Sequence, residues 1–340
     1  MRRRTLLTSV GAAALTTLAS TSASAVPVPS GPRFERLLLA PTTPAVPLTL
    51  QQAGIEVAAV SRAYSNARFA AVAANLPSLL SRLHATVTAT TGHARDTATA
   101  LLSRAYQVAS NAATKHGDDA IALTMADRGR THATTSGDHL VLTAATHILA
   151  ITMRRDGHHA AALDLLTGTA QELHISGSDP MILAAYGNLL CTAAYTAAQT
   201  GNASDADTYL QEVVTTAARI DGHRTLASEL PFGATAAVMY QISVHTALGN
   251  TGTALKHAAS INPAAIPTQE RLGRYLVDTA RAWSRHGNAD KAANAVLAAY
   301  RHSPEEVDRT SVRELVATLL YSPTPTPAAL RRLASNIGVH

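Results

Sequence analysis

The chain has 340 residues, of which 46% are apolar, only 4% are aromatic and 15% are charged. This composition predicts a core of closely packed helices rich in Ala, Leu and Val, and it argues against a sheet-rich fold. The formal net charge is +5, but without Arg2, Arg3 and Arg4 the remaining 25 bases and 23 acids give +2. We therefore expect no direct binding of nucleic acid by this chain. The single cysteine, Cys191, excludes an intrachain disulfide and a cysteine-based zinc site.

Residues 1–25 resemble an export signal. The arginines precede a short, mildly apolar run, and Ala23-Ser24-Ala25 provides a small-residue cleavage site. Arg3-Arg4-x-Leu6-Leu7 is similar to a twin-arginine signal, and the run is too short and polar for a stable membrane span. A basic, Ala-rich linker would give the same pattern, so export and a cytoplasmic location both stay open. Residues 26–47 are rich in Pro and Thr and are expected to be an unstructured linker.

Residues 48–322 carry a repeat that predicts the fold. Five glycines are each followed five residues later by alanine, and successive glycines are 40, 44, 48 and 38 residues apart. Each glycine separates two segments of apolar periodicity, which indicates a helix, a tight turn and a second helix. We expect an all-α, right-handed superhelix of antiparallel helical hairpins, that is, a TPR-like solenoid. The five pairs are Gly117/Ala122, Gly157/Ala162, Gly201/Ala206, Gly249/Ala254 and Gly287/Ala292.

The elements follow in chain order. Residues 48–83 are expected to form an irregular helical pair, broken near Asn75-Leu76-Pro77, that caps the array. A loop over 221–232 interrupts the repeat spacing, a last helix over 303–321 follows the array, and residues 323–340 form a tail in which a short helix is possible. The five hairpins are expected at 94–116 with 119–132, 139–155 with 158–175, 180–200 with 202–220, 233–248 with 253–261, and 268–286 with 289–302.

About four fifths of the chain, from Val57 to Leu320, resembles one protein family. It is similar to the C-terminal tetratricopeptide-like domain of actinobacterial XRE-type helix-turn-helix transcriptional regulators. After Phe-Gly that family has Pro, Thr and Asn and then a His-Arg pair, where this chain has Ala234, Thr235, Ala236, Tyr240 and Gln241. The resemblance rests on Arg62-Ala63-Tyr64, 102–108 (LSRAYQV), Ala126-Asp127-Arg128-Gly129, Tyr186-Gly187, Phe232-Gly233-Ala234-Thr235, 249–278 with Ile261-Asn262-Pro263, and 302–307 (HSPEEV).

The resemblance implies a binding or sensing module of a regulator. Regulators of this family carry a helix-turn-helix domain before a linker, and this chain begins at what looks like that linker. Two interpretations follow. The chain is an exported relative that acts as a scaffold outside the cytoplasm, or it is a cytoplasmic relative, either a remnant of a regulator or a regulator whose helix-turn-helix is encoded upstream of Met1. Either interpretation implies a protein without enzymatic activity.

Sequence motifs for catalysis, metals or cofactors are absent. No two of the 15 histidines are three or four residues apart, as ligands on one helical face would be. Phosphate-binding, dinucleotide-binding and nucleophile-elbow motifs do not occur either. Asp205 and Asp207, and likewise Glu305 and Glu306, lie at helix starts, where acids complement the helix dipole. We therefore predict no catalytic residue, no metal site and no cofactor.

One set of residues predicts a binding surface. With the helix phase fixed by each turn glycine, the first helix of a hairpin presents polar and basic residues to the concave side. No acid was found in this set, so we expect a positive groove that binds an acidic peptide segment or a small acidic ligand, and a homodimer is left open. Lys and Arg at helix C-termini also complement the dipole, but Arg104 and Arg274 lie early in their helices. The set is Arg104, Gln107, Asn111, Lys115, His147, Arg154, Asn188, Tyr195, Arg274 and Arg281, with Arg155, Gln199 and Arg285 on the same faces.

Overall fold

Glycine turns join most of the helices into antiparallel pairs, as a computed structural model shows for residues 34–173, 179–226, 230–322 and 326–339. The expected signal at 1–25 lies outside these described residues. The five turn glycines have φ between 78° and 88°, a left-handed conformation that glycine adopts without steric cost. The five alanines that follow them are completely buried, so each second helix packs closely on its neighbours. The predicted glycine turns and the predicted close packing at the alanines are both confirmed.

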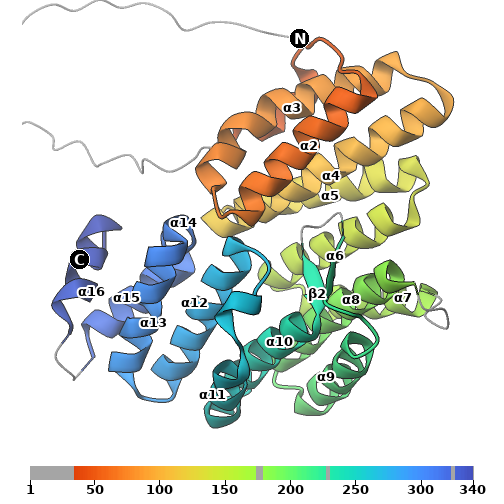
Figure 1. Cartoon of the computed structure of the whole chain (residues 1–340). Coiled ribbons are helices and arrows are strands. Elements are labelled where there is room, and N and C mark those ends of the chain that lie inside the picture. Colours follow the sequence, from red (N-terminus) through yellow and green to blue (C-terminus); the bar gives the residue numbers. More distant parts are fainter. Residues whose placement is uncertain (1–33, 174–178, 227–229, 323–325, 340) are drawn as a thin grey trace, which may run out of the picture. The chain divides into compact units, whose positions relative to one another are not determined.

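The helices pack in sequence order, and the fold is all-α and TPR-like apart from one small hairpin of strands (Figure 1). The first helices of the five hairpins, α4, α6, α8, α10 and α12, also contact one another in succession and form a continuous layer. The array comprises α2 (Leu50–Ser65), α3 (Phe69–Ala89), α4 (Gly92–His116), α5 (Asp119–Ser136), α6 (His139–Arg155), α7 (His159–Glu172), α8 (Pro180–Gln199), α9 (Ala203–Ala217), α10 (Ala234–Ala247), α11 (Thr251–Ser260), α12 (Gln269–Arg285) and α13 (Ala289–His302).

Short elements flank this array. Residues expected to be an unstructured linker form α1 (Arg36–Leu39) and the 3-10 helix η1 (Ala40–Thr42), and Leu37 is completely buried. A second 3-10 helix, η2 (Pro263–Ala265), lies between α11 and α12. The expected last helix is divided into α14 (Pro304–Val307) and α15 (Thr310–Leu320), and α16 (Ala328–Asn336) packs on α15 within the predicted tail.

Two local predictions were wrong. The break expected at Pro77 does not occur, because α3 continues through Pro77 with Leu76 and Leu80 completely buried on either side. Burial of these leucines outweighs the lost backbone hydrogen bond, and the chain turns earlier, at Ala67 with φ 55°. The loop over 221–232 holds the strands β1 (His223–Thr225) and β2 (Pro231–Gly233), which pair antiparallel and contact α8.

The hairpin of strands brings Phe232 onto Gly187, so two of the stretches that carried the family resemblance contact each other. The Phe232 ring is completely buried, and a Cβ at Gly187 would lie 2.0 Å from its Cζ atom. Helix α8 is the one helix in the described ranges that is long and apolar enough to cross a membrane. However, 78% of its apolar window is buried within the protein, as expected for a core helix.

The two ends of the repeat array contact each other. Helix α2 contacts α12, and the backbone N–H of Ala70 at the start of α3 donates to Glu305 Oε2 in α14 at 2.7 Å. Lys115, near the end of α4, donates to Glu306 of α14. Glu305 and Glu306, expected to act only on the dipole of their own helix, therefore bind the other end of the array.

Candidate functional site

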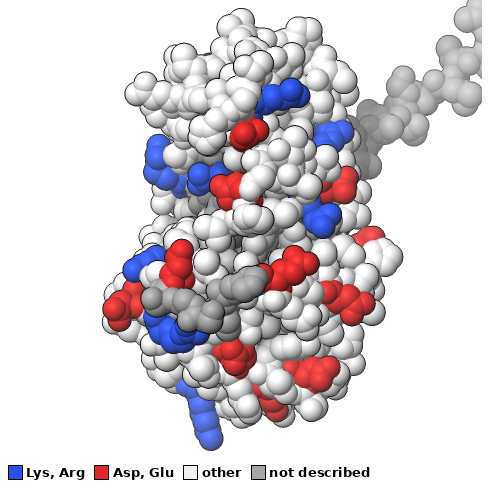
Figure 2. Space-filling view, turned by 90° about the vertical axis from the view of Figure 1, so that its right-hand side faces the viewer, with Lys and Arg blue, Asp and Glu red and all other residues white. Residues whose placement is uncertain are grey.

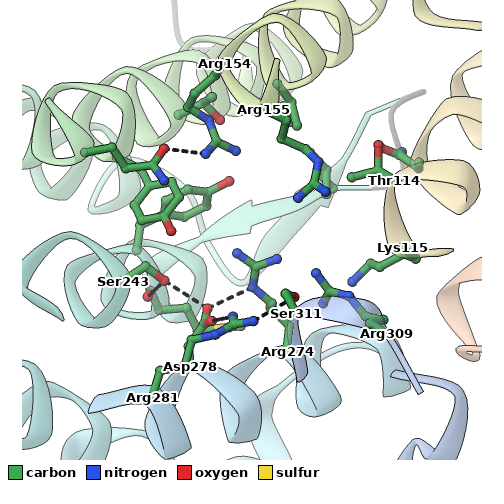
Figure 3. Close-up of a pocket in the computed structure, with 18 of the residues that line it drawn as sticks. Thr114, Lys115, Arg154, Arg155, Ser243, Arg274, Asp278, Arg281, Arg309 and Ser311 are labelled. Atoms are coloured by element: carbon green, nitrogen blue, oxygen red, sulfur yellow. Dashed lines mark hydrogen bonds and ion pairs between the residues drawn. The ribbon is translucent and has the colours of Figure 1, made fainter. Parts of the chain in front are cut away.

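A cavity of about 510 Å³ is lined by the C-terminal ends of α4, α6 and α8 and by residues of α10 and α12 (Figure 3). A second cavity of about 210 Å³ shares the walls formed by α8, α10 and α12. Tyr64, Tyr195 and Tyr240 contribute aromatic rings to the larger cavity. Its most prominent feature is positive charge, contributed by eight side chains: Lys115, Arg154, Arg155, Arg271, Arg274, Arg281, Arg285 and Arg309.

One buried network holds the charges at the α4 end of the cavity. Lys115 Nζ donates to a carboxylate oxygen of Glu270 and, at 2.9 Å, to Glu306 Oε2. Arg271 Nε lies 2.9 Å from Glu270 Oε2, and Arg309 binds Glu306. Burial alone would raise the pKa of Glu270, but the charges of Arg271 and Lys115 lower it to about 2. Glu270 is therefore ionised at neutral pH, and the contacts of Lys115 with Glu270 and Glu306 bind helices from the two ends of the array together.

A second network centres on Asp278 of α12. Its carboxylate accepts from Arg274 Nε at 2.8 Å, Arg281 Nη1 at 2.9 Å and Ser243 Oγ at 2.9 Å. Burial opposes ionisation, but the two arginines hold the pKa of Asp278 well below its usual range. Arg281 also donates to Ser311 Oγ at 3.0 Å. This network directs Arg274 and Arg281 toward the cavity.

Three arginines on the remaining walls have different partners. Arg155 binds both carboxylate oxygens of Asp119, at 2.7 and 3.1 Å. Arg154 Nη1 donates to Gln199 Oε1 at 2.5 Å, and its guanidinium lies 4.9 Å from the centre of the Tyr195 ring. Arg285 Nη1 donates to the carbonyl oxygen of Thr246 at 2.8 Å. No carboxylate among the described residues forms an ion pair with Arg154 or Arg285.

The charge balance of the cavity is therefore strongly positive. Eight cations line it, and four carboxylates pair with them: Asp119, Glu270, Asp278 and Glu306. The face of the molecule in Figure 2 shows acids and bases intermixed, without a comparable concentration of one sign. The uncompensated charge is a property of the cavity and is not shared by that outer face.

Six of the ten residues predicted from the sequence line this cavity, as do Arg155, Gln199 and Arg285. The six are Asn111, Lys115, Arg154, Tyr195, Arg274 and Arg281.

The other four predicted residues, Arg104, Gln107, His147 and Asn188, do not line the cavity. Gln107 is buried and donates a hydrogen bond to Ser103 Oγ. His147 is hydrogen-bonded to Thr192, and Asn188 donates to the Leu230 carbonyl oxygen. Arg104 is half-buried, and its Nε has no hydrogen-bond partner. In α4, α6 and α8 the middle of each predicted face is covered by neighbouring helices, and the cavity lies toward the C-terminal ends.

The expectation of an acid-free groove was wrong. Asp278 lies four residues after Arg274 and three before Arg281, on the face that was expected to carry no acid. Arg271 was missed, although Arg271, Arg274, Asp278, Arg281 and Arg285 follow one another at spacings of three and four residues, which places them on one helical face. Glu306 meets Lys115 only through the contact between the ends of the array, which no local pattern reveals.

Comparison with known proteins gives little beyond the fold. No family model matches the chain, and no curated protein sequence matches it. Among solved structures the chain is similar to BtubC (BKLC) from P. vanneervenii, with 16% identity and a TM-score of 0.39, over 83% of this chain and 96% of that one. This likeness is too distant to support a functional argument. The packing of its helical hairpins in sequence order, and not this likeness, makes the chain a TPR-like helical repeat protein. Its resemblance to XRE-type regulators stays a prediction.

Proposed function

We propose that this protein is a non-enzymatic binding and sensing module whose central cavity holds an anionic ligand. The observation that carries the proposal is the excess of cations over carboxylates in a cavity of about 510 Å³. Such a volume is typical of sites for small molecules or short peptide segments. Arginine predominates among the cations, and its planar guanidinium binds carboxylates and phosphates through two parallel hydrogen bonds.

Neutralising two arginines tests this proposal. Arg154→Gln and Arg285→Gln leave no carboxylate unpaired, because neither arginine has an acidic partner in the described structure. The control is Arg301→Gln, at an exposed position on α13. The probes are citrate, a tetraglutamate peptide and inorganic triphosphate, and we expect calorimetry at low salt to detect binding of at least one of them. The affinity for that probe should fall in both cavity variants and stay unchanged in Arg301→Gln. Absence of binding for every probe would contradict the proposal.

The finer assignment follows the sequence resemblance. We propose that the module is related to the regulatory domain of XRE-type regulators, with ligand binding as the sensed event. The alternative is an exported scaffold, and the observation that favours it is the Arg3-Arg4-x-Leu6-Leu7 pattern followed by Ala23-Ser24-Ala25.

The N-terminus of the native protein distinguishes the two assignments. Cleavage after Ala25, together with loss of export in Arg3→Lys/Arg4→Lys, is the result expected for the exported scaffold. Full-length protein retained in the cytoplasm would exclude export. An in-frame helix-turn-helix encoded upstream of Met1 would establish the regulator assignment.

A further inference from the structure

We infer that the ligand of the cavity is a small organic molecule or ion that carries at least two linked phosphate groups. This inference rests on the proposed function and narrows it from anions in general to compact polyanions. It is carried by the number of cations that line the cavity, by their place on opposite walls and by the charge that no carboxylate compensates.

The protein leaves part of the positive charge of the cavity without a carboxylate partner. The Glu270 and Glu306 network and the Asp278 network satisfy most of the α4 and α12 cations. Eight cations against four carboxylates still leave about four positive charges, two of them on Arg154 and Arg285. A ligand with a single carboxylate would leave most of this excess unpaired.

Arg154 is a cavity cation that has no carboxylate partner. It lines the cavity, and among the described residues its side chain donates to the amide oxygen of Gln199 and forms no ion pair. The guanidinium is held in place by the Tyr195 ring and by Gln199. An anion in the cavity would therefore pair with a positive charge that the protein itself leaves without a carboxylate.

The cations of the cavity repel one another. Burial lowers the pKa of Arg154, and the nearby charge of Arg274 lowers it further. Figure 3 shows Arg154 and Arg155 on one side of the opening and Arg274 and Arg281 on the opposite side. An anion between the two sides would relieve the repulsion among these cations. It must therefore present charge toward both walls.

Linked phosphate groups and an acidic peptide differ in how closely they place their negative charges. An extended peptide advances about 3.3–3.6 Å per residue, and successive side chains point to opposite sides. It therefore delivers its charges one at a time over a long path. A phosphate group concentrates up to about two charges and three acceptor oxygens on one centre. Linked phosphates thus match about four positive charges within one cavity. The α4 end of this cavity is bounded by the contacts of Lys115 with α12 and α14.

A competition among matched probes tests the inference on the full chain. The probes are inorganic triphosphate, orthophosphate, citrate and the tetraglutamate peptide, each titrated by calorimetry at low and at physiological salt. We expect triphosphate to bind at least tenfold more tightly than citrate or the peptide, and orthophosphate to bind more weakly than triphosphate. Arg154→Gln and Arg285→Gln should each lower the affinity for triphosphate about tenfold, whereas Arg301→Gln should not change it. Unchanged circular dichroism and melting temperature of the free variants would establish that they fold.

The outcomes separate the inference from the proposed function. If the peptide or citrate binds as tightly as triphosphate and the cavity variants weaken it, the phosphate inference is wrong and the anion-binding function stands. If triphosphate binds equally well to the cavity variants, its binding site lies elsewhere and the inference fails. If none of the probes binds at low salt, both statements fail.

Discussion

At the scale of single residues, a glycine and a phenylalanine far apart in the sequence determine how the strands sit on α8. Gly187 has no room for a side chain, because its Cβ would overlap the buried ring of Phe232. The neighbourhood of Gly168 in α7 is open by comparison, with no atom within 4 Å of the position that a Cβ would occupy.

We expect Gly187→Ala to destabilise the protein by about 1–3 kcal/mol or more, since the ring and strand must move to accommodate a methyl group. Gly168→Ala is the matched control and should gain up to about 1 kcal/mol from helix propensity. Urea unfolding of both variants measures the difference. Equal stability of the two variants would show that Phe232 does not occupy this position.

The free energy of unfolding is expected to depend on the ionisation of Glu270. The folded pKa of Glu270 is about 2, below an ordinary glutamate value of about 4.3. Its ionised form therefore contributes stability that is fully present above about pH 4.3 and is lost as the pH falls toward about 2. Glu270→Gln should cost about 3–5 kcal/mol at pH 7, because Arg271 loses its carboxylate partner and Lys115 keeps only Glu306.

At pH 3 the stability gap between wild type and Glu270→Gln should be narrower by roughly 1–2 kcal/mol, since one pKa unit corresponds to about 1.4 kcal/mol. The control is Glu314→Gln, at an exposed position on α15, and its gap should stay small at both pH values. Unfolding free energies from urea titrations at pH 7 and pH 3 provide the comparison. A gap that does not change with pH would contradict the low pKa.

At the scale of elements, the hairpin is the unit that repeats. Ala206 and Ala292 stand at equivalent places in α9 and α13, and both are completely buried where the second helix packs on its neighbours. We expect Ala206→Leu and Ala292→Leu each to cost about 1–3 kcal/mol by overpacking. Thermal unfolding is the measurement, with Ala203→Leu at an exposed position on α9 as the control. Unchanged midpoints for both buried variants would contradict the repeat register.

This scale also shows how far sequence reasoning reaches. Glycine spacing and apolar periodicity are local, so they predicted the five hairpins. The structure adds side-chain caps on α6 and α8, provided by Asp138 and Asp179. The path of the chain through Pro77 depends on tertiary burial of Leu76 and Leu80, which no local rule contains. Helix phase predicted cavity residues such as Lys115, Arg154 and Arg274, whereas Arg271 was missed on the same face of α12 and Arg309 was missed because it lies outside the repeats.

At the scale of the whole molecule, the contact between the two ends of the array is the feature that departs most from an ordinary solenoid. In a solenoid each repeat contacts only its neighbours, and stability is close to a sum of local terms. Here Lys115 of α4 binds Glu270 and Glu306, far along the chain. Opening at one end of the array is therefore coupled to opening at the other.

We expect Lys115→Met to weaken the coupling between the two ends of the array. The variant leaves two buried carboxylates with fewer partners, which costs about 3–5 kcal/mol. Hydrogen exchange should become faster in both α2–α3 and α12–α14, with less change in α8–α9. Lys256→Met, at an exposed position on α11, is the control and should change neither end. Uniform acceleration across all helices would indicate global destabilisation without specific coupling of the ends.

The joined ends also fix how many hairpins the chain can contain. An open array tolerates the duplication or loss of a unit, because the remaining units keep the same neighbours. In this chain, adding or deleting one hairpin would displace α12 and α14 from α4, so Glu305 would no longer reach the Ala70 amide and Lys115 would lose both carboxylates. The contact between the two ends therefore constrains the number of hairpins in the chain.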